Sequence, residues 1–195
     1  MNLRATILTL TLLLPLIVPA TAWGRTAEQA APGGTASAAA ARLLSLPEPD
    51  CDRLRDEPLA CLACNIYHEA RSEGADGMKL VGKVTMNRVG SDDFPDDVCA
   101  VVWQRLGDGP AQFSWTRDGR SHRVLNRSAW RRAVEVAALM FRDHYDPDFA
   151  VLIAGALRGP DFMWFHNGTV RPSWTRNLEK VAQIGRHTVY RRRGR

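Results

Sequence analysis

The chain has 195 residues, of which 45% are hydrophobic and 24% charged, and its net charge is +5. This balance is that of ordinary soluble globular proteins and excludes wholesale disorder. Four cysteines are too few for a small scaffold that depends mainly on disulfides. The length allows one medium-sized, mildly basic domain with a core of its own.

Residues 1–22 have the pattern of a secretory signal peptide. Arg4 supplies a positive start, Ala5–Val18 is an apolar stretch, and Ala20-Thr21-Ala22 matches the small residues that precede a cleavage site. The alternative is an uncleaved membrane anchor, although the stretch is short for a span of about 20 apolar residues. An uncleaved signal segment would be the protein's only expected contact with a membrane.

Residues 23–50 are rich in Ala, Gly, Pro, Ser and Thr, a composition typical of a flexible linker that buries little surface. Residues 51–195 would then form the working domain. With a signal peptide in front of it, this domain is expected to be exported, to the periplasm or to the cell wall.

Export favours two disulfides among the four cysteines, because disulfides persist in oxidising compartments. Cys61-Leu62-Ala63-Cys64 also has the spacing of a zinc or thioredoxin-like motif. Neither a second pair of metal ligands nor a preceding strand accompanies it. Metal binding, redox chemistry and free thiols stay open as alternatives at this point.

Hydrophobic periodicity and turn signals predict helices followed by a few strands. In chain order these are a helix over 57–73 capped by Asp56, a helix over 78–89, a short helix over 98–102 capped by Asp96 or Asp97, a hairpin or ordered loop over 107–127, a helix from Ser128 to before Pro147, a strand over 161–166, a helix over 172–183 and a strand over 188–190. Helices with a small, mostly antiparallel sheet make an α+β domain.

Two glutamates at the end of the first predicted helix are candidate catalytic groups. Glu69 falls on the flank of the apolar stripe and Glu73 falls within it. A carboxyl group that is partly withdrawn from water has a raised pKa and can donate a proton near neutral pH, as a glycosidic general acid must. From periodicity alone, two solvated carboxylates at a helix end are the commoner arrangement. A zinc protease is not indicated, because Ser72 stands where its motif needs a second histidine.

Two further clusters suit an uncharged sugar. The first is Gln112, Ser114 and Trp115, and the second is Trp164-Phe165-His166 with Trp174. Amides and hydroxyls can hydrogen-bond sugar hydroxyl and acetamido groups, while aromatic faces can stack on sugar rings. The same aromatic residues also suit a hydrophobic core, and His166 also suits a structural role.

The run Cys61-Leu62-Ala63 and then Ile66–Gly74 resembles the opening helix of the bacterial cell-wall hydrolases that include the spore cortex-lytic enzymes (the SleB/CwlJ type). The resemblance covers roughly residues 59–191, and its ordered blocks are together far more specific than Glu-Ala-Arg-x-Glu alone. The further blocks are Met86-Asn87-Arg88-Val89, Phe94-Pro95, Val98–Val102, Gln112–Trp115, Trp164–His166 and Ile184–Tyr190.

The resemblance implies a mostly helical, lysozyme-like fold and cleavage of peptidoglycan glycan strands, with Glu69 as catalytic acid. It also implies a disulfide between Cys61 and Cys99, which would leave Cys51 and Cys64 as a second bridge. The residues expected to bind substrate are Glu73, Gln112, Ser114, Trp115, His166 and Trp174.

The chain departs from the family pattern at two places. Ser72 stands where the family usually has Gly. Near His166 many members read His-Tyr-His-x-x-Tyr-Val, whereas this chain reads Met163-Trp164-Phe165-His166-Asn167-Gly168-Thr169-Val170. One His and one Tyr are missing, so substrate contacts in that loop are in doubt while Glu69 is retained.

The resulting hypothesis is a monomeric lytic transglycosylase. Two glutamates on one helix face could not flank a bond from opposite sides, as two-carboxylate glycosidases require. Glu69 alone would protonate the glycosidic oxygen and then act as base to form a 1,6-anhydro-muramic end, with no cofactor or metal. Peptidoglycan, and not nucleic acid, is the expected partner. The alternatives are a peptidoglycan amidase or peptidase that uses zinc or a Cys–His pair, and a non-catalytic wall-binding module.

Overall fold

The computed structural model describes residues 32–105, 107, 111–145, 162–169 and 171–194. The predicted signal peptide, the first part of the predicted linker and residues 146–161 lie outside the described residues. In these ranges, five α-helices precede a three-stranded sheet: α1 Pro32–Ser45, α2 Pro58–Ala70, α3 Gly74–Val89, α4 Val98–Val102, α5 Arg127–Tyr145, β1 Phe162–Asn167, β2 Leu178–Ile184 and β3 His187–Arg192. Of the helices within these ranges, none is long and apolar enough for a membrane crossing.

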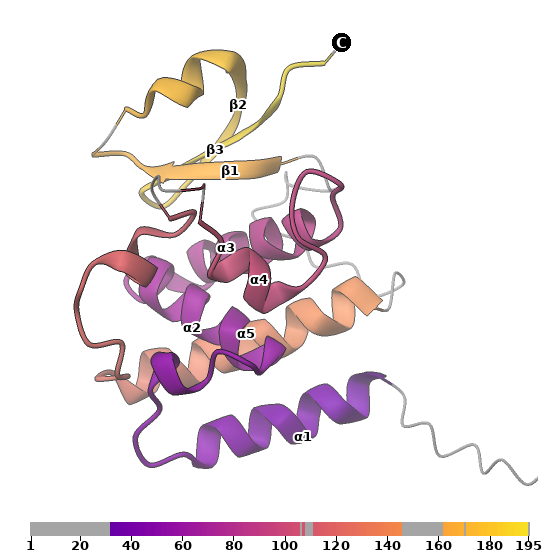
Figure 1. Cartoon of the computed structure of the whole chain (residues 1–195), viewed down its shortest axis with the longest axis vertical. Helices are drawn as coiled ribbons and strands as arrows, with labels where there is room; N and C mark the ends of the chain where they lie inside the picture. The colour runs from indigo at the N-terminus through magenta and orange to yellow at the C-terminus, as the bar shows by residue number, and fades with distance from the viewer. Residues whose placement is uncertain (1–31, 106, 108–110, 146–161, 170, 195) are drawn as a thin grey trace, which may run out of the picture.

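The sheet is antiparallel throughout, with the strand order β1-β3-β2. It lies at one end of the molecule, and α1 lies at the opposite end, with the other helices between them (Figure 1). The α+β class and the small antiparallel sheet predicted from the sequence are thereby confirmed.

Helix α3 is buried on two sides and joins the helices to the sheet. Leu80 and Val84, one turn apart, pack against Phe162, Ile184 and Val189 of the sheet. Other α3 side chains join the larger core that α2 and α5 share. Gly82 permits the close approach to α5, because a Cβ atom there would lie 2.8 Å from Cγ of Met140.

The flexible linker predicted for residues 23–50 is wrong for its second half. Residues 32–45 form helix α1, which lies along α5 (Figure 1). Leu43 is fully buried in the core, and its carbonyl accepts the indole N–H of Trp130. The small residues of this helix suggested a linker, but alanine is the best helix former and needs only a few apolar anchors to pack.

The predicted helix over 172–183 is also wrong. Residues 173–177 form a short 3-10 helix, η4, and residues 178–184 form β2, the edge strand next to β3. Gly185, with φ of +55°, makes the tight turn from β2 to β3 that few other residues could adopt. Pairing with β3, a tertiary effect, outweighs the local helical period.

Two helix starts also differ from the expectation. The backbone N–H of Ala129 donates to Oδ1 of Asn126, so Asn126 and not Ser128 caps α5. Glu57, not Asp56, precedes α2, which has Pro58 in its first turn. Asp97 does cap α4, by accepting the N–H of Ala100.

Residues 107–127, predicted to form a hairpin or an ordered loop, contain no named strand where they are described. A 3-10 helix, η3, spans Ser114–Arg117.

Both disulfides have the pairing that the sequence resemblance implied. Cys51 bonds to Cys64, which ties the 3-10 turn η2 (Cys51–Arg53) to α2. Cys61 bonds to Cys99 and so ties α2 to α4. The two bridges thus fasten α2 to η2 and to α4, and no cysteine is free.

Removing the Cys61–Cys99 bridge should cost more stability than removing Cys51–Cys64. The bridged residues are 38 apart in the first pair and 13 in the second, which corresponds to a loss of about 4 and about 3 kcal/mol in the chain-entropy model. The measurement is urea unfolding of the two double Cys→Ala variants. Equal losses, or the reverse order, would contradict this assignment.

Candidate active site

A cavity of about 650 Å³ opens between the C-terminal end of α2, the loop that precedes α5 and the end of β1. Polar, charged and aromatic side chains share its wall, as in sites that orient a hydroxylated ligand. The lining residues are Tyr67, His68, Glu69, Arg71, Ser114, Trp115, Asp118, Arg120, Ser121, His122, Arg123, Leu125, Asn126 and Asn167.

Glu69 lies in the last turn of α2 and lines the cavity. Burial disfavours the charged carboxylate and raises the pKa of Glu69 to about 7, while the positive charge of Arg88 opposes the rise. The carbonyls at the C-terminal end of α2 act in the same direction as burial. Near neutral pH, protonated and ionised Glu69 are therefore both populated, which a group that donates and later accepts a proton needs.

Arg88, at the end of α3, is the buried counter-charge of Glu69. It is 4% exposed, and its Nε donates to the carbonyl of Met163 at 2.9 Å. Its guanidinium carbon lies 4.9 Å from the ring centroid of Phe113 and 5.2 Å from that of Phe94. Burial lowers the pKa of Arg88 to about 10 and Glu69 opposes this, so Arg88 keeps its charge at neutral pH.

A buried hydrogen-bond network fixes Trp115 in the cavity wall. The indole N–H of Trp115 donates to Oδ1 of Asn65 at 2.9 Å, and the amide of Asn65 donates to the hydroxyl of Thr85. His68 stacks on Trp115 with ring centroids 4.4 Å apart. Burial, reinforced by the nearby charge of His122, lowers the pKa of His68 to about 4, so His68 is neutral in the working range.

His122 joins two carboxylates from different parts of the chain. Its Nδ1 lies 3.0 Å from Oδ2 of Asp52, and its Nε2 lies 3.3 Å from Oδ1 of Asp118. Burial disfavours the charged imidazole, but these two carboxylates outweigh it and raise the pKa of His122. Burial also opposes the charge of Asp52, yet Arg55 and His122 hold the pKa of Asp52 below its usual value.

The loop before α5 is held against α2 by a second contact. The hydroxyl of Tyr67 accepts the backbone N–H groups of Leu125 and Asn126, at 3.1 and 3.0 Å. Together with the His122 ion pairs, these bonds fix the loop from both sides. The cavity is thus built mainly from side chains and backbone whose positions are set by hydrogen bonds.

The structure brings together three of the predicted site residues. Glu69, Ser114 and Trp115 line the same cavity. Trp115 is only 5% exposed and its N–H is already bonded, so it forms a wall and not an open stacking platform. Gln112 is half-buried and does not line this cavity. Its backbone N–H donates to the carbonyl of Gln104.

Glu73, predicted to bind substrate, does not line the Glu69 cavity. Glu73 is not on the face of α2 but follows that helix, at the start of α3. Its side chain is 4% exposed and its carboxylate accepts the backbone N–H and the Nε of Arg186. Arg186 also donates to the hydroxyl of Ser72. Glu73 therefore fastens the β2–β3 turn to the helices.

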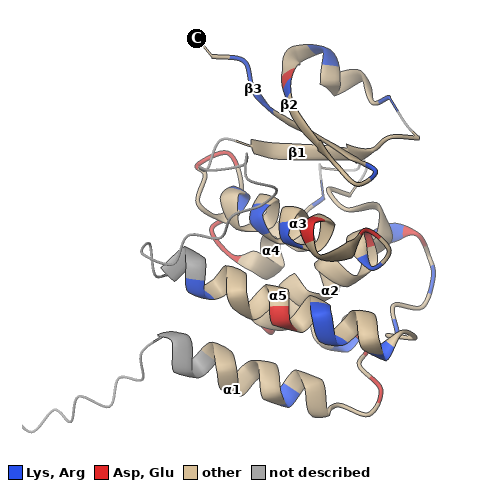
Figure 2. Ribbon diagram, turned by 180° about the vertical axis from the view of Figure 1, so that it is seen from behind, with Lys and Arg blue, Asp and Glu red and all other residues tan. Residues whose placement is uncertain are grey.

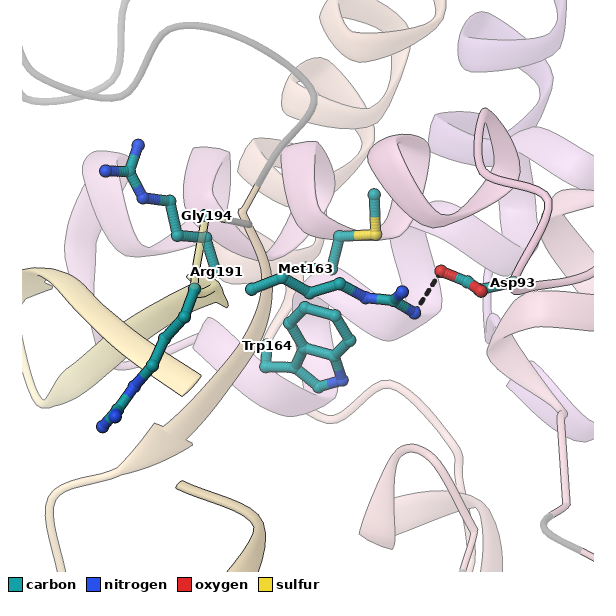
Figure 3. Close-up of a pocket in the computed structure, with 7 residues that line it drawn as sticks. Asp93, Met163, Trp164, Arg191 and Gly194 are labelled. Carbon is teal, nitrogen blue, oxygen red and sulfur yellow. Dashed lines mark hydrogen bonds and ion pairs between the residues drawn. The ribbon is translucent and has the colours of Figure 1, made fainter. Parts of the chain in front are cut away.

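Neither His166 nor Trp174 lines the Glu69 cavity. His166 lines a separate hollow of about 350 Å³, and the ring of Trp174 lies beside that of His166, with centroids 5.9 Å apart. A third hollow, of about 490 Å³, lies beside the end of β3 and is drawn in Figure 3. There Arg192 forms an ion pair with Asp93 and lies 5.8 Å from the ring centroid of Trp164. Neither hollow shares a lining residue with the Glu69 cavity.

Arg88, Asp118 and His122 were missed as site residues by sequence reasoning. Arg88 carried a signal, because it lies seven residues after Val81 and four after Val84, on the buried stripe of α3, where an arginine needs a partner. His122 and Asp118 carried none, since the other partner of His122, Asp52, lies 70 residues away in the chain. Within the described residues, no group of three or more His, Cys, Asp or Glu is placed to hold a metal ion.

Residues 72–190 match the family model described as Cell Wall Hydrolase. The matched range begins just after Glu69 and contains the cavity loop, Arg88 and Asn167. Curated relatives are spore cortex-lytic enzymes of Halalkalibacterium halodurans (28% identical over 132 residues, 68% of this chain and 34% of the relative), Oceanobacillus iheyensis (29% over 126 residues, 65% and 38%) and Bacillus subtilis (28% over 126 residues, 65% and 35%). The matched region thus spans little more than a third of each relative. No solved structure matches significantly.

Replacing His122 with Gln should destabilise the protein most in mildly acidic solution. A raised folded pKa stabilises the fold fully below the unfolded value of 6.5, and this contribution is lost as pH rises through the folded value. Urea unfolding should show that the free energy of unfolding falls by about 2 kcal/mol at about pH 5.5 and by less at about pH 9. His166→Gln is the control, because the ring of His166 contacts the Tyr190 hydroxyl and a backbone carbonyl, and neither is a carboxylate. A loss for His122→Gln that is the same at both pH values would contradict the ion-pair role.

Proposed function

The chain belongs to the cell wall hydrolase family, and we propose that it is an enzyme that cleaves the glycan strands of peptidoglycan with Glu69 as its acid. One observation carries this proposal. The half-buried carboxyl group of Glu69 lies in the wall of a polar and aromatic cavity, where its pKa is raised to about 7. The names of the spore cortex-lytic relatives support a substrate in the bacterial cell wall.

Protonated Glu69 would donate its proton to the glycosidic oxygen that follows N-acetylmuramic acid. The C1 centre then becomes oxocarbenium-like, and the substrate's own acetamido oxygen can stabilise it. Ionised Glu69 next takes the proton of the C6 hydroxyl, whose oxygen bonds to C1. This sequence gives a 1,6-anhydro-muramic end and regenerates the acid. Because Glu73 is bound to Arg186, the scheme uses one glutamate.

A hydrolytic outcome is a second candidate, favoured by Asp118. This aspartate lines the same cavity as Glu69. The backbone N–H of Arg120 lowers the pKa of Asp118, and His122 adds to this effect, so Asp118 stays ionised. A raised and a lowered carboxyl pKa in one site suit an acid and a base, respectively. Asp118 would activate water in that case, and the product would be a reducing muramic end.

The alternative chemistries have less support. An amidase or peptidase with a Cys–His pair would need a free thiol, but all four cysteines are in disulfides. Within the described residues no cluster suits zinc, so that alternative gains nothing from the geometry. A wall-binding module held by charge would benefit from one basic face, whereas Lys and Arg are spread over α1, α3, α5 and the sheet (Figure 2).

We place the action of the enzyme outside the cytoplasm, in the periplasm or at the wall. The two disulfides support this location, because such bonds persist in oxidising compartments. The signal-peptide pattern of residues 1–22 supports it independently.

Glu69→Gln should lower the release of soluble fragments from purified sacculi by about 10²- to 10⁴-fold, because glutamine keeps the shape but cannot donate the proton. Chromatography of the digest measures the release, and circular dichroism checks folding. Glu73→Gln is the matched control, since its carboxylate faces Arg186 and not the cavity; it should retain cleavage. A folded Glu69→Gln variant with full activity would refute the assignment.

Mass spectrometry of the same digests separates the two products. A 1,6-anhydro end is lighter than a hydrolysed end by one water molecule. If the product is hydrolysed, Asp118→Asn should abolish its formation. If the product is anhydro, Asp118→Asn should still release it, and Asp118 then serves only to hold His122.

The activity should fall as pH rises through about 7, because the acid step needs protonated Glu69. Arg88 lowers the pKa of Glu69, so Arg88→Met should move this fall to higher pH. Arg88→Lys, which keeps the charge, should leave it near the wild-type position. Initial rates across the pH range measure the effect, on variants whose thermal unfolding shows that they are folded. Coincident profiles for Met and Lys would exclude an electrostatic role of Arg88.

A further inference from the structure

The outer face of the sheet, the face away from α3, carries a hollow that the catalytic scheme does not use. Its volume is about 350 Å³, and it is lined by His166, Gly168, Arg171, Thr175, Lys180, Gln183, Thr188 and Tyr190. Strand register places His166, Thr188 and Gln183 in one row across the three strands. Tyr190 and Lys180 form the next row, two residues along and therefore on the same face.

His166 and Tyr190 contribute aromatic rings to the wall of this hollow, and the ring of Trp174 lies next to both. His166 stacks on Tyr190 with centroids 5.4 Å apart, and its Nε2 lies 3.0 Å from the Tyr190 hydroxyl. Trp174, on η4, stands nearly perpendicular to Tyr190 at 5.6 Å. Trp174 is 37% exposed, one of two large hydrophobic side chains that are exposed in the described part of the chain. A tryptophan that only packs in a core need not be exposed, whereas a ring that stacks on a ligand must be.

The polar part of the hollow is basic. Lys180 and Arg171 lie in its wall with the hydroxyl of Thr188 and the amide of Gln183, and none of its lining residues is acidic. An aromatic face with hydroxyl and amide groups suits the ring and acetamido group of an N-acetylated sugar. The two cations suit a carboxylate on the same molecule.

We propose that this outer-face site, His166, Arg171, Trp174, Lys180 and Tyr190, binds a carboxylate-bearing N-acetylated amino sugar of the glycan strand, a muramyl unit, apart from the point of cleavage. The proposal rests on the function proposed above. His166 lines the outer-face site and the next residue, Asn167, lines the Glu69 cavity. The end of β1 therefore separates the two sites, and one chain of linked sugars can contact both.

Binding is tested without cleavage in the Glu69→Gln chain, by sedimentation with purified sacculi. Adding Trp174→Ala should weaken binding about tenfold, whereas Trp174→Phe, which keeps an aromatic ring, should retain most of it. Unchanged affinity for Trp174→Ala, or a chain that does not bind sacculi, overturns the proposal. Circular dichroism of each variant checks that the sheet is intact.

The carboxylate is tested with soluble sugars in the same Glu69→Gln chain. Calorimetry should show tighter binding of a muramyl-containing tetrasaccharide than of an N-acetylglucosamine tetramer, and Lys180→Met with Arg171→Met should remove this preference. Equal binding of the two sugars by the unmodified site overturns the proposal. Failure of the proposed function would give a different result. The wild-type chain would then release no fragments from sacculi, whatever effect Trp174→Ala has on binding.

Discussion

The carboxyl group of Glu69, half-withdrawn from water and opposed by one buried arginine, is the constraint on which the site depends. Burial favours the protonated form of Glu69, whereas a fully solvated glutamate would be ionised at neutral pH. Arg88 limits the rise, so that the pKa of Glu69 stays at about 7. The rings of Phe94 and Phe113 and the carbonyl of Met163 keep Arg88 in place. Helix α3 therefore tunes a group that α2 positions.

The remaining structure serves to keep that geometry. Two disulfides hold α2 to the turn before it and to α4. The bonds from Asn65 to Trp115 and to Thr85 join α2, α3 and the cavity loop. His122 adds an electrostatic clamp on the same loop. Contacts between segments distant in the chain, such as Trp115 with Asn65 and His122 with Asp52, make the cavity a property of the whole helical core and not of one motif.

Local patterns in the sequence predicted most of the fold. The helices around Leu62, Val81 and Val134 follow clear apolar stripes, and the structure has all three. The errors lie where tertiary contacts decide. Residues 178–184 became a strand because β3 is available to pair with them, and α1 is ordered because Leu43 finds a place beside Trp130.

The candidate site was predictable in part. Glu69 could be selected because a recognisable run of residues surrounds it. Glu73, four residues on, looked equivalent until its partner Arg186, 113 residues away, was placed beside it. His122 could not be selected, because its role depends on Asp52, 70 residues away, which only the fold brings to its ring. Charge pairs between distant segments leave no periodic trace in a sequence.

The most direct test of this account is the titration of the Glu69 side chain itself. Carboxyl-carbon NMR of protein labelled at glutamate, with the Glu69→Gln spectrum used to assign the signal, gives its pKa without reference to any substrate. The account predicts a midpoint at about 7. A midpoint near the ordinary glutamate value of 4.5 would show a solvated carboxylate, and Glu69 could not then serve as the acid near neutral pH.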